Sequence, residues 1–510
     1  MQEKSRTVNT IRNFSFSMAS YILNMLLSFV TRTIFIHYLA KEYLGVNGLF
    51  SNILSLLSLA ELGAGGAFVS LLYKPIAQKK TDDICLVMAS FRKAYRIIAV
   101  TIGVIGFSLT PFLDSIVGEN NIEELPLIYV LYICNSIVGY LCASEKALIK
   151  ADQKAYIVTK CSQVAVIIQY TLQALFLVLT HNYVIYLLIQ IACAIGGNLY
   201  IAYRARRMYP YLREKPGKLP AEMKEDIIKK IKGGFCTHFG YIIASGTDSI
   251  VISHYLGLTV LGIYSNYLMV LGIIEKFVLM VFEAARASAS NFVVSKDQDE
   301  NYQFFKKMNF FIMVLLGFIC TNLTVLFNPF IKFWIGDEFV MEFSLVFLAV
   351  TVFFIGWHGI KLPISLFREA TGLYYRDRYF ALMEGIANVC ISIALVRKWG
   401  LYGVLLGTVI SSFITTFSGV YLIFRYIFQK PIHLYFADMA KYILIEVVIG
   451  AVCMAVCRLF HVANLIQFIF CTVVCVAVSG GLYFIAFART KEFKYFLVVI
   501  KNVLPHRKSN

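Results

Sequence analysis

Apolar stretches of about 20 residues or more recur from one end of the chain to the other, and this feature most constrains its fold. A helix of that length crosses the ~30 Å hydrocarbon layer of a membrane. The chain has 510 residues, of which 59% are hydrophobic and 15% are charged, and a soluble protein of this size needs a larger polar surface. The sequence therefore predicts an all-α polytopic membrane protein.

Charges and turn residues divide the apolar sequence into about fourteen predicted transmembrane helices. The first six are expected near residues 13–39, 48–73, 91–113, 125–147, 157–179 and 183–203. The next six are expected near residues 234–256, 259–288, 308–330, 343–367, 379–396 and 401–426, and a final pair near 442–460 and 464–488.

This order predicts two pseudo-symmetric six-helix lobes plus two C-terminal helices. The expected parts are an N-lobe (1–203), a cytoplasmic amphipathic linker (204–233), a C-lobe (234–430), an extra helix pair (431–488) and a basic cytoplasmic tail (489–510).

The net charge of the chain is +17, and the lysines and arginines that produce it lie mainly in alternate loops between the predicted helices. The densest group runs from Arg204 to Lys232, whereas the intervening loops carry few positive residues. This is the positive-inside pattern, which places both termini in the cytoplasm. The basic balance is therefore interpreted as an orientation signal and a contact for anionic membrane lipids, not as a nucleic-acid surface.

The predicted linker contains Ile227, Ile228 and Ile231 at helical spacing among lysines. This pattern favours a basic amphipathic helix that lies on the inner leaflet. An ordinary solvated linker helix is an equal alternative. The tail at 489–510 has the same character and the same alternative.

Motifs for catalysis, metals and cofactors are missing from the sequence. The twelve cysteines lie mostly inside apolar stretches, and none belongs to a CxxC motif or to a Cys/His group with metal-ligand spacing. There is no G-x-x-x-x-G-K-[ST] loop, no HExxH and no GxSxG. We therefore expect a transporter that has no metal site, no cofactor and no catalytic chemistry of its own.

A faint internal repeat relates the two halves of the chain. The triplet His-Tyr-Leu at 37–39 and again at 254–256 is followed in both halves by Leu-Gly, an aromatic-Ser-Asn triplet and a glutamate. The pairs that share one offset are Ser51/Ser265, Asn52/Asn266 and Glu61/Glu275, and a weaker echo relates Ala151–Tyr156 to Ala370–Tyr375. Because each half has an even number of predicted helices, the repeats are expected to be parallel, as in transporters with alternating access around a central cavity.

Charged residues near the middle of predicted helices are the candidates for function, since each costs roughly 2.5–3.5 kcal/mol on insertion scales. The planar fork of an arginine suits a phosphate, so Arg32 and Arg286 are the first candidates for binding an anionic head group. The predicted substrate cavity further includes Lys276, Asn52 and Asn266.

Buried carboxylates are candidates for a coupling ion, H⁺ or Na⁺, because burial stabilises the neutral form of a carboxyl group. These candidates are Glu61, Asp248 and Glu275. Structural interpretations stay open beside the functional ones. Arg286 can pair with Glu283 or Glu275 on the same helix, Lys361 can extend to the inner interface, and Glu61 can accept a hydrogen bond in a close helix contact.

Several segments resemble the Wzx-type polysaccharide flippases of the multidrug/oligosaccharidyl-lipid/polysaccharide (MOP) exporter superfamily. The segments are Leu44–Ala77 with its AELG and LYKP motifs, Ala151–Tyr156 (ADQKAY), Phe367–Tyr374 (FREATGLY) and Gly400–Thr408 (GLYGVLLGT). The resemblance runs across nearly the whole chain and is most specific in the first of these segments.

The resemblance implies a flippase that moves an undecaprenyl-diphosphate-linked oligosaccharide from the inner to the outer leaflet of the bacterial cytoplasmic membrane. Such a protein serves O-antigen, capsule or exopolysaccharide synthesis, and polysaccharide polymerase machinery is a candidate partner. In the family the diphosphate is expected to meet basic residues of the cavity, whereas the candidate positions here are as acidic as they are basic.

Three alternatives remain at this point. An ion-coupled multidrug exporter of the same superfamily would have a cavity dominated by acidic groups. A membrane enzyme such as a polymerase or glycosyltransferase would need a large outer loop, which the predicted topology does not contain. A structural scaffold is disfavoured by the charges inside the predicted helices.

Overall fold

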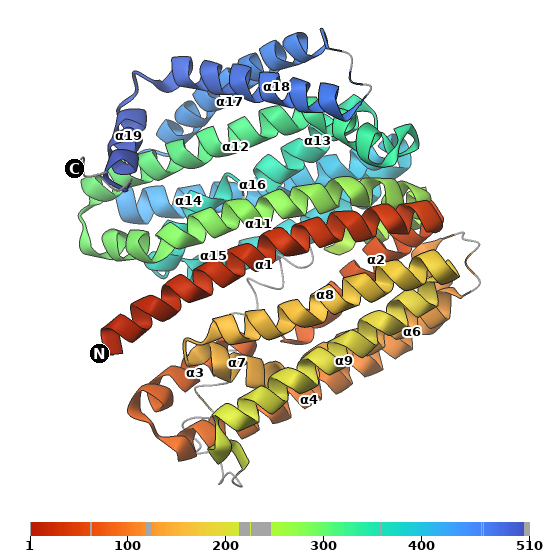
Figure 1. Cartoon of the computed structure of the whole chain (residues 1–510). Coiled ribbons are helices and arrows are strands. Elements are labelled where there is room, and N and C mark those ends of the chain that lie inside the picture. The colour runs from red at the N-terminus through yellow and green to blue at the C-terminus, as the bar shows by residue number, and fades with distance from the viewer. Residues whose placement is uncertain are drawn as a thin grey trace, which may run out of the picture. The chain divides into compact units, whose positions relative to one another are not determined.

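The computed structural model describes residues 2–61, 64–118, 122, 124–213, 225, 246–356, 359–460, 462 and 464–503 (Figure 1). Within these residues the regular structure is helical and no strand occurs, so the prediction of an all-α protein is confirmed. The chain divides into two compact units, Met1–Ser265 (unit 1) and Asn266–Asn510 (unit 2).

The described residues of unit 1 include the helices α1 to α9 and the start of α11. The helices are α1 (Gln2–Tyr38), α2 (Lys41–Leu57), α3 (Ala64–Gln78), α4 (Thr81–Leu109), α5 (Leu113–Val117), α6 (Leu125–Leu141), α7 (Ala143–Ala151), α8 (Ala155–Thr180), α9 (Tyr183–Met208) and the first residues of α11 (Leu258–Ser295). Short 3-10 helices at Ser58–Glu61, Thr110–Phe112 and Pro210–Arg213 join some of them, and residues 246–256 are helical as well.

Unit 2 contains the rest of α11 and the helices that follow it. These are α12 (Gln298–Ile335), α13 (Phe343–Thr351), α14 (Lys361–Ala370), α15 (Tyr374–Trp399), α16 (Leu401–Ile423), α17 (His433–Cys457), α18 (Leu465–Phe487) and α19 (Lys491–Val503). A 3-10 turn occurs at Asp337–Phe339, and π-helical turns follow α13 at Val352–Gly356 and α16 at Phe424–Phe428. Within this unit, α17 and α18 pack beside α12 (Figure 1).

Eleven helices of the described residues are long and apolar enough to cross a membrane, and α6 with α7, bent by 40°, makes twelve if the pair is one span. These twelve correspond to twelve of the predicted spans. The predicted span 48–73 is interrupted by the 3-10 helix Ser58–Glu61, and most of the predicted span 234–256 lies outside the described residues. The membrane class is confirmed, and the number fourteen stays a prediction.

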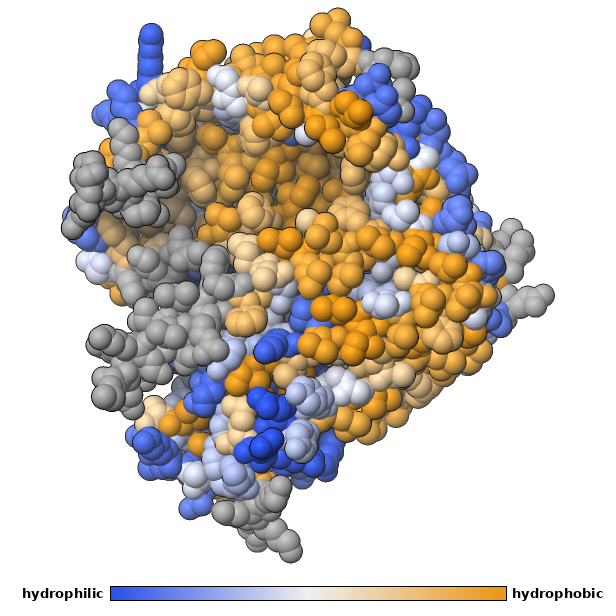
Figure 2. Space-filling view, viewed as in Figure 1, coloured by the Kyte–Doolittle hydropathy of each residue, from blue (hydrophilic) through white to orange (hydrophobic). Residues whose placement is uncertain are grey.

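Apolar side chains cover large parts of the exposed surface (Figure 2). Val100 and Leu179 of unit 1 and Leu444 of unit 2 are 65%, 67% and 66% exposed. Apolar patches of this extent are rare on soluble monomers, and here they are the surface that faces lipid.

The internal repeat extends to the backbone. In each half, a glycine with positive φ ends a helix. Gly118 follows α5, before α6, and has a φ of 79°, and Gly336 follows α12, before α13, and has a φ of 104°. In the loops that the sequence relates, Gln153 (59°) and Gly372 (73°) occupy the same left-handed position. The helices that follow, α8 and α15, each have 26 residues. The predicted duplication therefore agrees with the local backbone of both halves.

The ends of the predicted parts differ in how far they are described. The predicted amphipathic helix at 219–232 lies outside the described residues except for Glu225. In the predicted tail, α19 is helical and stacks Phe496 on Phe311 of α12 at a centroid distance of 5.1 Å, while residues 504–510 lie outside the described residues. The predicted part boundaries themselves stay predictions.

Candidate functional site

A polar cluster surrounds Arg32 inside unit 1. Arg32 lies on α1 and is half-buried, and its guanidinium donates a hydrogen bond of 2.5 Å to Oγ of Ser265, near the start of α11. We define the Arg32 cluster by its members, Arg32, Asn47, Ser51, Tyr132, Tyr183, Tyr186 and Ser265. The members other than Arg32 carry hydroxyl or amide side chains.

Three tyrosines form one wall of the Arg32 cluster. Tyr132 of α6 and Tyr183 of α9 join their hydroxyl groups at 2.8 Å, and the rings of Tyr183 and Tyr186 stack at a centroid distance of 5.7 Å. Asn47 donates to the Tyr183 hydroxyl at 3.4 Å, and Ser51 hydrogen-bonds to Tyr132. The charge of Arg32 interacts with all three tyrosines. Arginine and hydroxyl groups together supply the hydrogen-bond donors that an anionic oxygen needs.

A close approach of two repeat-related segments holds Ser265 beside Arg32. A Cβ on Gly45 of α2 would overlap the carbonyl oxygen of Leu258, and a Cβ on Gly262 of α11 would lie 2.5 Å from the carbonyl oxygen of Lys41. Gly45 and Gly262 are the equivalent glycines of the sequence repeat. Only glycine permits this backbone contact, so the repeat explains how the beginning of the second half packs on the first half.

The other predicted residues of this region have different surroundings. Asn52 donates a hydrogen bond of 2.6 Å to Ser249, and the neighbouring Asp248 is half-buried and interacts with Tyr264. In unit 2, Asn266 is fully buried, Glu275 is half-buried, and the side chain of Lys276 is exposed. The predicted roles of these residues in binding or coupling stay predictions.

Glu61 lies in the 3-10 helix that interrupts the second predicted span. Its carboxylate accepts a hydrogen bond of 2.5 Å from Tyr95 of α4 and a second one from Tyr140 of α6. A Cβ on Gly65 would lie 2.8 Å from the Tyr95 hydroxyl, so the small residues after Glu61 let the helices approach. The hydrogen-bonded, close-packed interpretation of Glu61 is confirmed, and its role in ion coupling stays a prediction.

Arg286 is surrounded by carboxylates. It forms ion pairs with Glu283 on its own helix and with Glu369 on α14. The side chains of Arg286 and Glu369 are 35% and 43% exposed. The expected pairing with Glu283 is confirmed, and Glu369 belongs to the FREATGLY motif.

A buried ion pair lies in unit 2. Lys361 of α14 pairs with Glu384 of α15 at 2.8 Å, and the two side chains are 19% and 12% exposed. Ser412 and Thr415 of α16 donate hydrogen bonds to the same carboxylate. The expectation that Lys361 extends to the inner interface is therefore wrong, because Glu384 holds it inside the helix packing. Lys361 and Glu384 lie on different helices, so their pairing could not be predicted from the spacing of residues in the sequence.

The ADQKAY motif forms the loop between α7 and α8. Asp152 accepts a hydrogen bond of 2.7 Å from Tyr209, just after α9, and pairs with Lys154 at 2.7 Å. Burial, together with the hydrogen bond to Asp152, raises the pKa of Tyr209 well above its ordinary value. This motif therefore anchors a loop to the end of α9.

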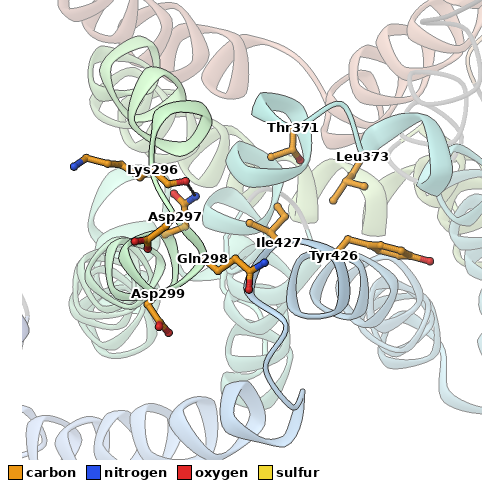
Figure 3. Close-up of a pocket in the computed structure, with 9 residues that line it drawn as sticks. Lys296, Asp297, Gln298, Asp299, Thr371, Leu373, Tyr426 and Ile427 are labelled. Atoms are coloured by element: carbon orange, nitrogen blue, oxygen red, sulfur yellow. Dashed lines mark hydrogen bonds between the residues drawn. The ribbon is translucent and has the colours of Figure 1, made fainter.

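A pocket within unit 2 lies where several helices end and has a volume of about 770 Å³ (Figure 3). It is lined by Lys296, Asp297, Gln298, Asp299, Asn301, Thr371, Leu373, Tyr426 and Ile427. Asp297 caps α12 by accepting from the backbone of Glu300, and Thr371 and Leu373 belong to the FREATGLY motif. The pocket contains charges of both signs and none of the predicted site residues.

The fold is shared with solved transporters of the MOP superfamily and with a lipid II flippase. The lipid II flippase MurJ in an inward closed conformation matches with a TM-score of 0.64 and 17% identity, over 95% of this chain and 99% of that chain. An inward-facing MATE family multidrug transporter matches with a TM-score of 0.62 and 15% identity, over 78% and 92%. A MOP superfamily transporter from Pyrococcus furiosus matches with a TM-score of 0.54 and 14% identity, over 81% and 93%.

Sequence comparison identifies the family within this class. The model of the polysaccharide biosynthesis protein family matches residues 10–286, which is more than half of the chain. The chain belongs to this family. No curated protein sequence matches the chain significantly.

Proposed function

We propose that the chain is a flippase that carries an undecaprenyl-diphosphate-linked oligosaccharide from the inner to the outer leaflet of the bacterial cytoplasmic membrane. Its termini lie in the cytoplasm, and its lobes expose a polar path to each side alternately. It performs no chemistry on the oligosaccharide. Membership of a polysaccharide biosynthesis family and a fold shared with a lipid II flippase support the proposal.

The observation that carries the proposal is the Arg32 cluster. A lipid-linked sugar does not cross unaided, because its polar head group would lose its hydration in hydrocarbon. A protein that moves it must replace water at the diphosphate. The cluster contains the planar guanidinium group of Arg32 together with hydroxyl and amide groups, and it lies among helices of unit 1. Groups of this kind bind phosphate oxygens.

Translocation in proteoliposomes tests the proposal. The full chain is reconstituted with a labelled undecaprenyl-diphosphate oligosaccharide, and the fraction that reaches the opposite leaflet is measured. We expect protein-dependent flipping that Arg32→Ala strongly reduces. Lys332→Ala is the charge-matched control, because Lys332 is exposed and pairs with the exposed Asp337 just after α12. Flipping that persists in Arg32→Ala would retain the function and reject the site.

An ion-coupled exporter of cationic drugs is the second candidate, because MATE transporters share the fold. This function would depend on carboxylates, so charge reversal at Asp248 or Glu61 would abolish efflux of a cationic dye under an H⁺ or Na⁺ gradient. Dye efflux without flipping of any lipid-linked oligosaccharide would favour this candidate.

A further inference from the structure

Glu446 lies near the middle of α17, in the predicted extra helix pair and outside the sites described above. It occupies a helix that is long and apolar enough to span the membrane. An ionised carboxylate at that depth costs roughly 2.5–3.5 kcal/mol on insertion scales, so its surroundings must explain why it is there.

A glycine on the neighbouring helix makes room for this carboxyl group. A Cβ placed on Gly317 of α12 would overlap Oε1 of Glu446 and would lie 2.5 Å from the hydroxyl oxygen of Tyr483 on α18. Gly317 is buried and Tyr483 is 5% exposed. The helices α12, α17 and α18 therefore meet at Gly317. The Glu446 carboxyl group and the Tyr483 hydroxyl both occupy the space that a side chain at position 317 would fill.

The rest of this site is polar but neutral. Asn322 of α12 donates a hydrogen bond of 3.0 Å to Ser479 of α18, and Thr321 lies beside the Tyr483 hydroxyl. The titratable groups that face Glu446 are Cys320 of α12 and Tyr483 of α18. Among the residues that the structure describes, no ion pair or hydrogen bond compensates the Glu446 carboxylate.

We propose that Glu446, in the pocket formed by Gly317 and Tyr483, is a proton-binding site of the α12–α17–α18 packing. The carboxylate takes up one proton and becomes a neutral carboxylic acid, which this membrane-depth position tolerates far better than the anion. A metal ion is the less suitable ligand, since no group of three His, Cys, Asp or Glu side chains suited to a metal occurs in the described part of the chain.

The geometry gives each neighbour a distinct part. Gly317 provides the space, and Tyr483 is a positioning residue whose hydroxyl can donate to the anion and accept from the acid. Loss of the proton places an uncompensated charge between α12 and the helix pair, so proton binding and helix packing are linked. The site is independent of the substrate proposed above.

Infrared difference spectroscopy of the full chain in lipid bilayers, recorded while the pH is stepped, measures the site without any substrate. We expect a carboxylic-acid C=O band that appears as the pH falls and is missing in Glu446→Gln. Gly317→Ala should shift the pH at which the band appears, because the new methyl group displaces the carboxyl. Gly450→Ala is the matched control, since a Cβ at this position of α17 meets nothing within 4 Å.

Tyr483→Phe retains Glu446, so it tests the site even if the Glu446→Gln variant does not fold. This variant should change the pH at which the same band appears. The proposal is overturned if the spectra of the unaltered chain and of Glu446→Gln show the same pH-dependent acid bands, or if neither Gly317→Ala nor Tyr483→Phe moves the band that Glu446→Gln removes. Loss of the band on adding Na⁺ at constant pH would also overturn it, because sodium would then be the ligand. None of these results depends on whether the chain flips an oligosaccharide.

Discussion

The two units surround their half-buried and buried cations with different partners. In unit 1, Arg32 donates a hydrogen bond to Ser265, and its charge interacts with three tyrosines. In unit 2, Lys361 pairs with a buried glutamate, and Arg286 pairs with two carboxylates. Basic side chains inside apolar units therefore meet hydroxyl groups around Arg32 and carboxylates around Lys361 and Arg286. The proposed anion site at Arg32 and helix–helix attachment in unit 2 should respond differently to mutation.

The largest expected effect concerns the buried pair in unit 2. Lys361→Ala removes the cation that is hydrogen-bonded to Glu384 and leaves only the longer-range interaction of Glu384 with Arg368, and breaking a buried pair costs up to roughly 3–5 kcal/mol. We expect a clear fall in the unfolding temperature of the purified chain in detergent. The double variant Lys361→Ala/Glu384→Ala should recover part of this loss. Equal stability of Lys361→Ala and the control Lys332→Ala would show that the pair does not hold the helices together.

The next effect is expected in unit 1 and in transport, not in stability. Arg32→Ala removes a charge-assisted contact worth roughly 1.5–3 kcal/mol to an anionic ligand, which corresponds to about a 10- to 100-fold loss of flipping. The unfolding temperature should fall less than in Lys361→Ala, because the hydrogen bond of Arg32 to Ser265 contributes only about 1 kcal/mol. Arg32→Lys should restore part of the flipping, since it keeps the charge without the fork. If Arg32→Ala strongly lowered the unfolding temperature but flipped normally, Arg32 would be a structural residue and not part of the anion site.

The close contact that supports the Arg32 cluster gives a third prediction. Gly45→Ala forces a methyl group against the carbonyl oxygen of Leu258, and overpacking of this kind costs roughly 1–3 kcal/mol. We expect lower thermal stability and reduced flipping together, because Ser265 moves relative to Arg32. Gly196→Ala is the control, since nothing lies within 4 Å of its Cβ position. Identical behaviour of the two variants would contradict the packing described here.

The smallest effect is expected at Arg286. Its ion pairs are partly exposed, and such pairs contribute only about 0–1 kcal/mol. Arg286→Ala should therefore reduce flipping less than about fivefold. It should lower the unfolding temperature by about a few degrees at most. A loss of flipping as large as that of Arg32→Ala would make Arg286 part of the anion site as well.

Helices and their approximate ends could be predicted from the sequence, because the length of an apolar stretch decides whether it can span a membrane. The interruption at Ser58–Glu61 could not, since the apolar composition continues through it. The sequence repeat correctly related the loops at Gln153 and Gly372, where a left-handed residue is required in both halves.

The candidate site was predicted only in part. Arg32 was found because a charge in an apolar helix is conspicuous. Tyr132, Tyr183 and Tyr186 were missed because tyrosines are also common as anchors at membrane interfaces. Their convergence depends on the packing of α6 and α9 against α1 and α2, which no local spacing contains.

Flipping by three reconstituted proteins tests the central claim most directly: the unaltered chain, Arg32→Ala and Arg286→Ala, each with a labelled undecaprenyl-diphosphate oligosaccharide. We expect protein-dependent flipping that falls about 10- to 100-fold in Arg32→Ala and stays near the unaltered level in Arg286→Ala. Equal flipping by all three proteins, or flipping lost only in Arg286→Ala, would contradict the assignment of the Arg32 cluster as the anion site.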